Sequence, residues 1–374
     1  MAQIREAESR GDLKRFIQLA YDLYRENPNW VAPLRGQLYK TLREKNNPRF
    51  DNGPVAFLLA WEDDTPVGRI MVGIDENVNR EKKRRAGYIS LFECVEDTKT
   101  AFALLDAAMD WLRERGMDEV VGPVSPTGGD DFRGLLVMGF DGPPALMNVY
   151  NHAYYRDFFE AYGFEKKNDL YAYYLDVGIF PEERFRRVVE YSMRRFHFHV
   201  DMADFKNIER EIRDIREILL LAMPEDWEDM VVPSVEDIRK EARFLLPLLK
   251  PELVQIARED GTGRPLGFVV GAPDYNQVLQ KLKGRLFPFG VIKALYYRRR
   301  IDGARVFIQF VIPEYQGKGV NGAIFYHMLR HAKAAGITHG DGSTIGEENL
   351  KSRQSVERAG GRHYRTYRYY HKAI

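Results

Sequence analysis

Residues 306–322 constrain the fold more than any other stretch of this sequence. Residues 306–312 are rich in β-branched and aromatic residues, which is typical of a strand. A loop with Gly317, Gly319 and Gly322 follows, and from Ala323 the apolar spacing is helical. A glycine turn between a strand and a helix points backbone N–H groups at one spot, in front of the positive end of the helix dipole. The stretch therefore predicts a strand–turn–helix unit that can bind a phosphate or pyrophosphate, with Lys318 as an added charge.

Two common nucleotide signatures do not fit this loop. Lys318 is followed by Gly319 and Val320, so the phosphate loop that ends in Lys and Ser or Thr is absent, and the glycine spacing is not that of a dinucleotide fold. On the glycines alone, a tight turn without a ligand is an equal alternative. The surrounding sequence must decide between them.

Composition limits the class of protein. A chain of 374 residues exceeds the usual size of one core and predicts two domains. The 56 basic and 55 acidic residues balance, so neither a nucleic-acid nor a membrane partner is expected. The single cysteine, Cys94, allows no internal disulfide. No long apolar run or leader is present, so a cytoplasmic location is expected; the oligomeric state stays open.

The chain repeats one order of elements. Each half predicts a strand, two helices, a hairpin, a long strand, a helix, a strand, a helix and a closing strand. The acidic hairpin turns at 62–66 and 259–265 correspond, as do helix ends at Gly163 and Gly360. Agreement in element order predicts a duplicated α/β (α+β) fold, with domains 1–178 and 179–374. Residues 275–300, basic and aromatic without strand alternation, look like an insertion in the second copy.

The second half resembles the GNAT (Gcn5-related N-acetyltransferase) superfamily. Gln316, Gly317, Lys318, Gly319 and Val320 match that family's coenzyme loop, whereas Asn321 stands where Gly or Ala is usual and Gly322 comes one residue late. Glu348–Asn349, before a helix that ends at Gly360, resembles a second family segment. The resemblance covers 179–374 well and 1–178 by pattern only.

The resemblance implies two tandem GNAT-like folds, each a mixed central sheet flanked by helices. It implies acetyl-CoA or another acyl-CoA as co-substrate and no metal. The backbone of two residues would pair with pantetheine, the loop would bind the pyrophosphate, and one asparagine would lie near the pantetheine. These implied coenzyme-binding residues are Phe310, Val311, Gln316, Gly317, Lys318, Gly319, Val320, Asn321, Gly322 and Asn349.

The first half departs from the family at the corresponding loop. Residues 92–101 contain no glycine, and Glu96 and Asp97 would repel a pyrophosphate. Asp97 or Thr98 is better interpreted as a helix N-cap. The first domain is therefore predicted to have a degenerate coenzyme loop.

The usual tyrosine acid is also missing. Its position holds Val356 in the second half and Phe159 in the first. A transferase would need another group or water to protonate the leaving thiolate. Candidates near the predicted site are Glu347, Glu348, Asp341, Tyr315 and His363, each with a solvated charge or structural role as the alternative.

The favoured function is acyl-CoA-dependent N-acyltransfer to an unknown small-molecule or peptide amine. One alternative is a non-catalytic CoA-binding or scaffold protein, and a second is an aminoacyl-tRNA-dependent transferase. The acceptor pocket is expected in residues 122–134 or 275–300, because loops and insertions build such pockets.

Overall fold

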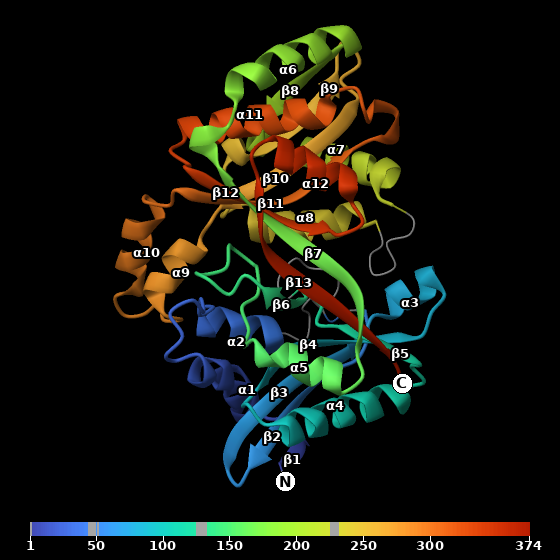
Figure 1. Cartoon of the computed structure of the whole chain (residues 1–374), viewed down its shortest axis with the longest axis vertical. Helices are drawn as coiled ribbons and strands as arrows, with labels where there is room; N and C mark the ends of the chain where they lie inside the picture. Colours follow the sequence, from blue (N-terminus) through green and yellow to red (C-terminus); the bar gives the residue numbers. More distant parts are fainter. Residues whose placement is uncertain (1, 44–49, 51, 125–132, 225–231) are drawn as a thin grey trace. The chain divides into compact units, whose positions relative to one another are not determined.

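The structure, a computed structural model, describes residues 2–43, 50, 52–124, 133–224 and 232–374. The chain packs into two compact units (Figure 1). Unit 1 comprises Met1–Tyr171, Asn276–Arg299 and Tyr364–Ile374; unit 2 comprises Ala172–Tyr275 and Arg300–His363. Two segments of the second sequence half thus belong to unit 1, which the predicted boundary at 178/179 does not anticipate.

Unit 1 contains a mixed sheet in the order β1-β2-β3-β4-β5-β13, with β6 beside β13. Strands β4 and β5 run parallel, and the pairs β1/β2, β2/β3, β3/β4, β5/β13 and β6/β13 run antiparallel. The strands are β1 (Gln3–Glu6), β2 (Val55–Glu62), β3 (Thr65–Ile74), β4 (Ala86–Cys94), β5 (Glu119–Gly122), β6 (Leu135–Met138) and β13 (Arg362–Ala373).

Alternate residues of the unit 1 strands enter two different cores, because side chains point to opposite faces of a strand. Leu58 and Ala60 pack into a cluster with α4 and α5, whereas Leu59 and Trp61 pack into a cluster with α1 and α2. The helices of this unit are α1 (Arg10–Leu23), α2 (Arg35–Arg43), α3 (Glu76–Lys82), α4 (Thr98–Arg113), α5 (Tyr154–Ala161), α9 (Asn276–Leu282) and α10 (Gly290–Arg298).

Helix α4 begins as the sequence predicts. The Asp97 carboxylate accepts a hydrogen bond from the Thr100 backbone N–H at 2.8 Å, which is the geometry of an N-cap. Residues 92–101 of the first half therefore form a strand end and a capped helix start rather than a glycine loop.

The strands of unit 2 follow one another in the order β8-β9-β10-β11-β12-β7. Strands β11 and β12 run parallel, and the pairs β8/β9, β9/β10 and β10/β11 run antiparallel. The core of unit 2 combines these strands with α6, α7 and α11. The strands are β7 (Glu165–Asp176, shared with unit 1), β8 (Phe198–Met202), β9 (Val254–Glu259), β10 (Pro265–Pro273), β11 (Gly303–Val311) and β12 (His339–Gly346). The helices are α6 (Glu182–Phe196), α7 (Ile208–Ala222), α8 (Val235–Leu245), α11 (Val320–Ala334) and α12 (Leu350–Arg358).

The closing strand of each sequence half joins the other half's sheet. Strand β7 ends the first half, but its residues from Ala172 onward lie in unit 2, where β7 neighbours β12. Strand β13 ends the chain and pairs in unit 1 with β5, where Tyr370 lies opposite Gly122, and with β6 (Figure 1). Two continuous domains, as predicted from the element order, therefore do not describe how the strands pair.

The strand and helix predicted around the glycine turn are confirmed, since β11 ends at Val311 and α11 begins at Val320, and the other elements largely follow the predicted order. Helices α3 and α6 and strand β6 are additional elements, and the predicted insertion forms α9 and α10. Among the helices that the structure describes, none has the length and apolar character to cross a membrane.

Candidate functional site

The segment that links β11 to α11 has the strand–turn–helix form that the sequence predicts. After β11, residues Pro313–Tyr315 form one 3-10 turn, and α11 starts at Val320. Gly317 and Gly319 have φ angles of 78° and 86°, in the left-handed region that favours glycine. The two glycines are therefore required by the turn itself.

The three glycines differ in their surroundings. A Cβ on Gly319 would lie 2.4 Å from the Ser192 Oγ on α6, so this position also needs glycine for close packing. A Cβ on Gly317 or Gly322 would meet nothing within 4 Å. The loop is thus closed against α6 at Gly319 and open to solvent at Gly317 and Gly322.

The start of α11 has the form of an anion site. Gly319 is its N-cap and offers no side chain to the helix end. The first N–H groups of a helix have no intrahelical carbonyl to bind, and the helix dipole makes this end positive. Gly322 lies in this first turn with open space beside it. These residues fit the pyrophosphate of a CoA molecule, which they would bind through backbone N–H groups.

Polar side chains of the loop stabilise the turn. The Gln316 side-chain amide donates to the Val311 carbonyl at 3.2 Å, so this carbonyl, predicted to face pantetheine, already accepts one hydrogen bond. The Lys318 ammonium lies 4.4 Å from the centre of the Tyr315 ring. Because these side chains contact the protein itself, backbone N–H groups are the groups of this loop that would bind a pyrophosphate.

Asn321, the residue that departs from the family loop, links three elements. Its side-chain amide donates to the Ser355 Oγ on α12 at 3.2 Å, and its carbonyl accepts from the Gln309 side chain on β11 at 3.2 Å. A glycine or alanine could not make the first of these bonds. Asn321 thus fixes α12 relative to the start of α11.

Strands β11 and β12 part beside the loop. Residues Gly303–Val306 of β11 pair with His339–Gly342 of β12, and β11 then continues to Val311. Residues 306–310 are half-buried although β11 lies between β10 and β12. The end of β11, which includes Phe310, is thus a partly exposed part of an interior strand next to the turn. Such a strand end can pair with an extended ligand that carries amide groups, such as pantetheine.

Two predicted acids have structural contacts. Tyr315 is buried, and its hydroxyl donates to Glu259 at 2.9 Å. Burial and then this hydrogen bond raise the pKa of Tyr315. Asp341 is buried on β12, opposite Arg305 of β11.

The remaining predicted polar residues lie around α12. The side-chain oxygen of Asn349 accepts a hydrogen bond from the Ser352 backbone N–H at 3.1 Å and caps α12. The Glu347 backbone carbonyl accepts a hydrogen bond from the Arg353 guanidinium at 2.7 Å. Glu348 lies against Gly346, and the His363 ring lies 5.7 Å from that of Tyr173. Asn349, predicted to lie near pantetheine, thus has a capping role.

Tyr173 on strand β7, which was not among the predicted site residues, contacts α12. Its hydroxyl donates to Glu357 at 3.0 Å and accepts from Arg353 at 3.2 Å. Val356, which occupies the usual acid position, instead packs against Gly361. Burial is the main cause that raises the pKa of Tyr173, so its phenol keeps its proton at neutral pH. The only signal in the sequence was the run of tyrosines in the closing strand of the first half.

A buried polar cluster in unit 1 was also missed. Glu93 accepts hydrogen bonds from the hydroxyls of Tyr24 at 2.7 Å and Tyr155 at 2.8 Å, and lies 3.6 Å from Arg69. Burial raises the pKa of Glu93, against the lowering by Arg69 and the two tyrosines. The neighbouring Leu91 has a φ of 52°, where β3 and β4 shift register. The sequence around Glu93 does not reveal this cluster, because the other four residues of 91–95 are apolar and the partners of Glu93 lie far away in the chain.

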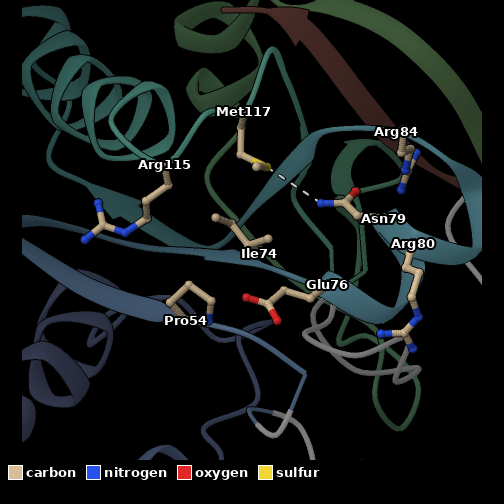
Figure 2. Close-up of a pocket in the computed structure, with 8 residues that line it drawn as sticks. All are labelled: Pro54, Ile74, Glu76, Asn79, Arg80, Arg84, Arg115 and Met117. Atoms are coloured by element: carbon tan, nitrogen blue, oxygen red, sulfur yellow. Dashed lines mark hydrogen bonds between the residues drawn. The ribbon is translucent and has the colours of Figure 1, made fainter.

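Unit 1 also has a cavity of about 550 Å³ between the end of β3, α3 and the end of α4 (Figure 2). Arg80, Arg84 and Arg115 line it, together with Glu76 and the Asn79–Met117 contact drawn in Figure 2. Arg115 stacks on Trp111, with its guanidinium carbon 3.9 Å from the ring centre.

Other predicted regions are partly covered. Of the predicted acceptor loop 122–134, residues 125–132 lie outside the described residues. Among the residues that the structure does describe, no group of three or more histidine, cysteine or carboxylate side chains could hold a metal ion.

Comparison with known proteins gives two full-length relatives, while no family model matches the sequence. The chain is 32% identical to the bacterial ceramide synthase of Caulobacter vibrioides over 375 residues, which covers 97% of this chain and 95% of that protein. It is 28% identical to protein YghO of Escherichia coli K12, over 99% of this chain and 95% of that one.

Solved structures share the fold. A tandem GNAT protein from the clavulanic acid biosynthesis pathway matches all of this chain and 98% of its own, with a TM-score of 0.59 at 9% identity. A glucosamine N-acetyltransferase region of a fungal multi-domain enzyme matches with a TM-score of 0.61 at 16% identity, over 38% of that chain. A GNAT protein from Sphaerobacter thermophilus gives 0.55 at 11% identity, over 95% of that chain. The predicted fold class and superfamily are confirmed.

Proposed function

The chain belongs to the GNAT superfamily and, within it, to the family of the bacterial ceramide synthase, and from this we propose that it N-acylates a long-chain amino alcohol with an acyl-CoA. A ceramide is the amide of a fatty acid and such an amine. The relative's name therefore favours a fatty acyl donor, with acetyl-CoA as the short-chain alternative. The observation that carries the proposal is the open, glycine-built start of α11 beside the parting strands β11 and β12.

The reaction joins an amine to a thioester carbonyl and releases CoA as the thiol. The amine nitrogen loses a proton, and the leaving sulfur gains one. The site supplies orientation, by binding pyrophosphate at residues 317–322 and pantetheine along β11 near Phe310 and Val311. Backbone N–H groups at a parted strand can also stabilise the negative charge that develops on the carbonyl oxygen.

In this proposal Tyr173 is the group that protonates the leaving sulfur in place of the missing tyrosine of α12. Its hydroxyl lies beside α12 and carries a proton at neutral pH, as its raised pKa requires. Tyr173→Phe should lower kcat by about 10²–10⁴ with little change in KM. An unchanged kcat at every pH would exclude this role, and Tyr174→Phe on the same strand serves as the matched control.

The coenzyme site is best tested at Gly322. Gly322→Glu places a carboxylate in the first turn of α11 without a clash, whereas Gly322→Ala adds only a methyl group in open space. We expect Gly322→Glu to weaken CoA binding at least about tenfold through charge repulsion, and Gly322→Ala to bind as the wild type. Isothermal titration with CoA, acetyl-CoA and palmitoyl-CoA measures this. Equal affinities for the two variants would refute a pyrophosphate site here.

Turnover separates the proposal from its alternatives. The wild type is incubated with palmitoyl-CoA or acetyl-CoA and a long-chain 2-amino-1,3-diol, and the amide is measured by mass spectrometry. Amide formation that Gly322→Glu abolishes supports the proposal, and the preferred donor gives the acyl length. CoA binding without turnover would instead favour a non-catalytic binding protein. Transfer from aminoacyl-tRNA alone would favour the second alternative, an aminoacyl-tRNA-dependent transferase, although the net charge of +1 gives the chain no overall basic character.

A further inference from the structure

Helix α10 and the turn before it expose large apolar side chains. Phe287 and Phe289 are 77% and 70% exposed, and Ile292 and Leu295 are 68% and 61% exposed. Single exposed apolar residues are ordinary on a protein surface, but a contiguous group marks an interaction site. We call this group the α10 surface; its apolar members are Phe287, Phe289, Val291, Ile292, Leu295 and Tyr296.

The α10 surface stands on a well-anchored base. The Asn276 side chain at the start of α9 donates to the carbonyls of Pro144 and Ala145, both at 2.9 Å. At the far end of α9, the Gly284 carbonyl accepts from the Arg35 N–H at 3.2 Å, and Gly284 packs so closely on Tyr21 that a Cβ would lie 2.5 Å from its ring. Figure 1 shows α9 and α10 as a compact helical pair. The pair thus presents α10 from a fixed platform.

The apolar residues share one face of the helix. Phe289, Ile292 and Leu295 are spaced three residues apart, which places them on the same side. At 100° per residue, Lys293 and Arg298 fall on the two borders of this face, and both are exposed. Exposed aromatic and aliphatic side chains next to basic ones can bind at a membrane interface, where the apolar groups meet acyl chains and the basic groups meet headgroups.

The charge around α10 differs from that of the whole chain. Residues 275–301 contain seven basic residues and no acidic one, whereas the chain carries a net charge of +1. We expected no membrane partner because the charges of the whole chain balance, but that balance hides the local excess of positive charge in residues 275–301. Anionic lipid headgroups attract such a basic segment, and acyl chains accept its apolar face.

We propose that the α10 surface docks this protein on the surface of a bilayer that contains anionic lipid. Phe287, Phe289, Ile292 and Leu295 enter the interface, and Lys293, Arg298 and Arg299 contact the headgroups. A second copy of the chain fits the surface less well, because a symmetric contact would bring the same positive charges together. The membrane proposal rests on the residues of α9 and α10 alone. The proposed function adds only that its amphiphilic substrates would be concentrated at the same bilayer surface.

Vesicle flotation of the purified full-length chain tests the proposal without any substrate, so its result is independent of catalysis. The vesicles are phosphatidylcholine alone, or phosphatidylcholine with about 30% phosphatidylglycerol. We expect the wild type to float with the anionic vesicles and binding to fall as salt increases. The double variant Ile292→Glu/Leu295→Glu should bind at least about tenfold less, because charge on the apolar face opposes insertion. Arg298→Gln/Arg299→Gln should lose the preference for anionic vesicles.

The matched control is Val188→Glu/Tyr191→Glu on α6, where the two side chains are 61% and 60% exposed. It adds the same charge at similar exposure and should float like the wild type; thermal unfolding verifies that all variants fold. Flotation of Ile292→Glu/Leu295→Glu at the wild-type level would overturn the proposal, as would a wild type that binds neither vesicle. A wild-type dimer that this variant dissociates, with no vesicle binding, would assign the α10 surface to a second copy instead.

Discussion

At the scale of the residue, glycines of one motif have different roles. Gly319 combines a φ of 86° with a Cβ position 2.4 Å from Ser192, whereas Gly322 is helical and open. Gly319→Ala should destabilise the fold by about 1–3 kcal/mol, through overpacking and left-handed strain. Gly322→Ala should be neutral or stabilising by about 0.5–1 kcal/mol. Urea unfolding of both variants measures this, and equal stabilities would contradict the packing at α6.

Among the buried residues, Glu93 links stability to pH. Its folded pKa is raised above the ordinary value of 4.5, so the folded state binds this proton more tightly than the unfolded state. The contribution of Glu93 to the free energy of unfolding is therefore most favourable at low pH. This contribution decreases as the pH rises from the pKa of Glu93 in the unfolded chain to its higher pKa in the folded protein.

Tyr155→Phe tests this linkage, because it removes a hydrogen bond that favours the charged carboxylate. We expect the pKa of Glu93 to rise further and the variant to lose about 1–3 kcal/mol at neutral pH, with a smaller loss at low pH. Urea unfolding across a pH series checks the slope. Tyr154→Phe is the control, because its hydroxyl donates to the Cys94 carbonyl and not to Glu93. Parallel pH curves for wild type and Tyr155→Phe would show that Glu93 does not respond.

At the scale of the element, sequence analysis succeeds where apolar spacing and caps agree. Helix α4 has seven buried residues and the Asp97 cap, and it lies within two residues of the helix over 100–115 that the apolar spacing predicts. Helix α6 was missed because its fifteen residues include only two buried ones, Val189 and Ser192, among many charged side chains. The coenzyme loop was predicted because local backbone geometry needs glycine. Tyr173 and Glu93 were not, because their partners lie far away in sequence.

Helix α12 shows how an element can depend on its ends. None of its residues is buried, so hydrogen bonds from its surroundings stabilise it. Asn349 caps its first turn at Ser352, and Asn321 donates to Ser355 on its side. Asn349→Ala should cost about 1 kcal/mol of local helix stability. Hydrogen exchange should therefore be about fivefold faster at the Ser352 and Arg353 amides, while α11 amides keep their wild-type rates. Unchanged exchange at Ser352 would mean that the cap contributes nothing to α12.

At the scale of the whole molecule, the closing strands show what the pattern along the sequence leaves open. Both β7 and β13 are rich in tyrosine, and each mixes buried and half-buried residues without strict alternation. The residue types of a segment predict that it forms a strand but not which neighbour that strand pairs with. The matching order of elements in the two sequence halves predicted two continuous domains, 1–178 and 179–374. In the structure, Tyr370 of β13 instead completes the core of unit 1 beside Phe159 and Phe164.

This arrangement predicts that the first sequence half does not fold alone. A fragment of residues 1–178 lacks β13, which leaves the β5 edge unpaired and removes the Tyr370 ring, a loss of about 3–5 kcal/mol for the ring alone. We expect the fragment to be aggregated or to bind a dye for exposed apolar surface. The matched construction joins residues 362–374 to the same fragment through a flexible linker and should be folded and monomeric by circular dichroism and gel filtration. If the shorter fragment unfolds with the same midpoint in urea as the longer one, β13 is not part of unit 1, and the continuous domains predicted from the element order would be correct.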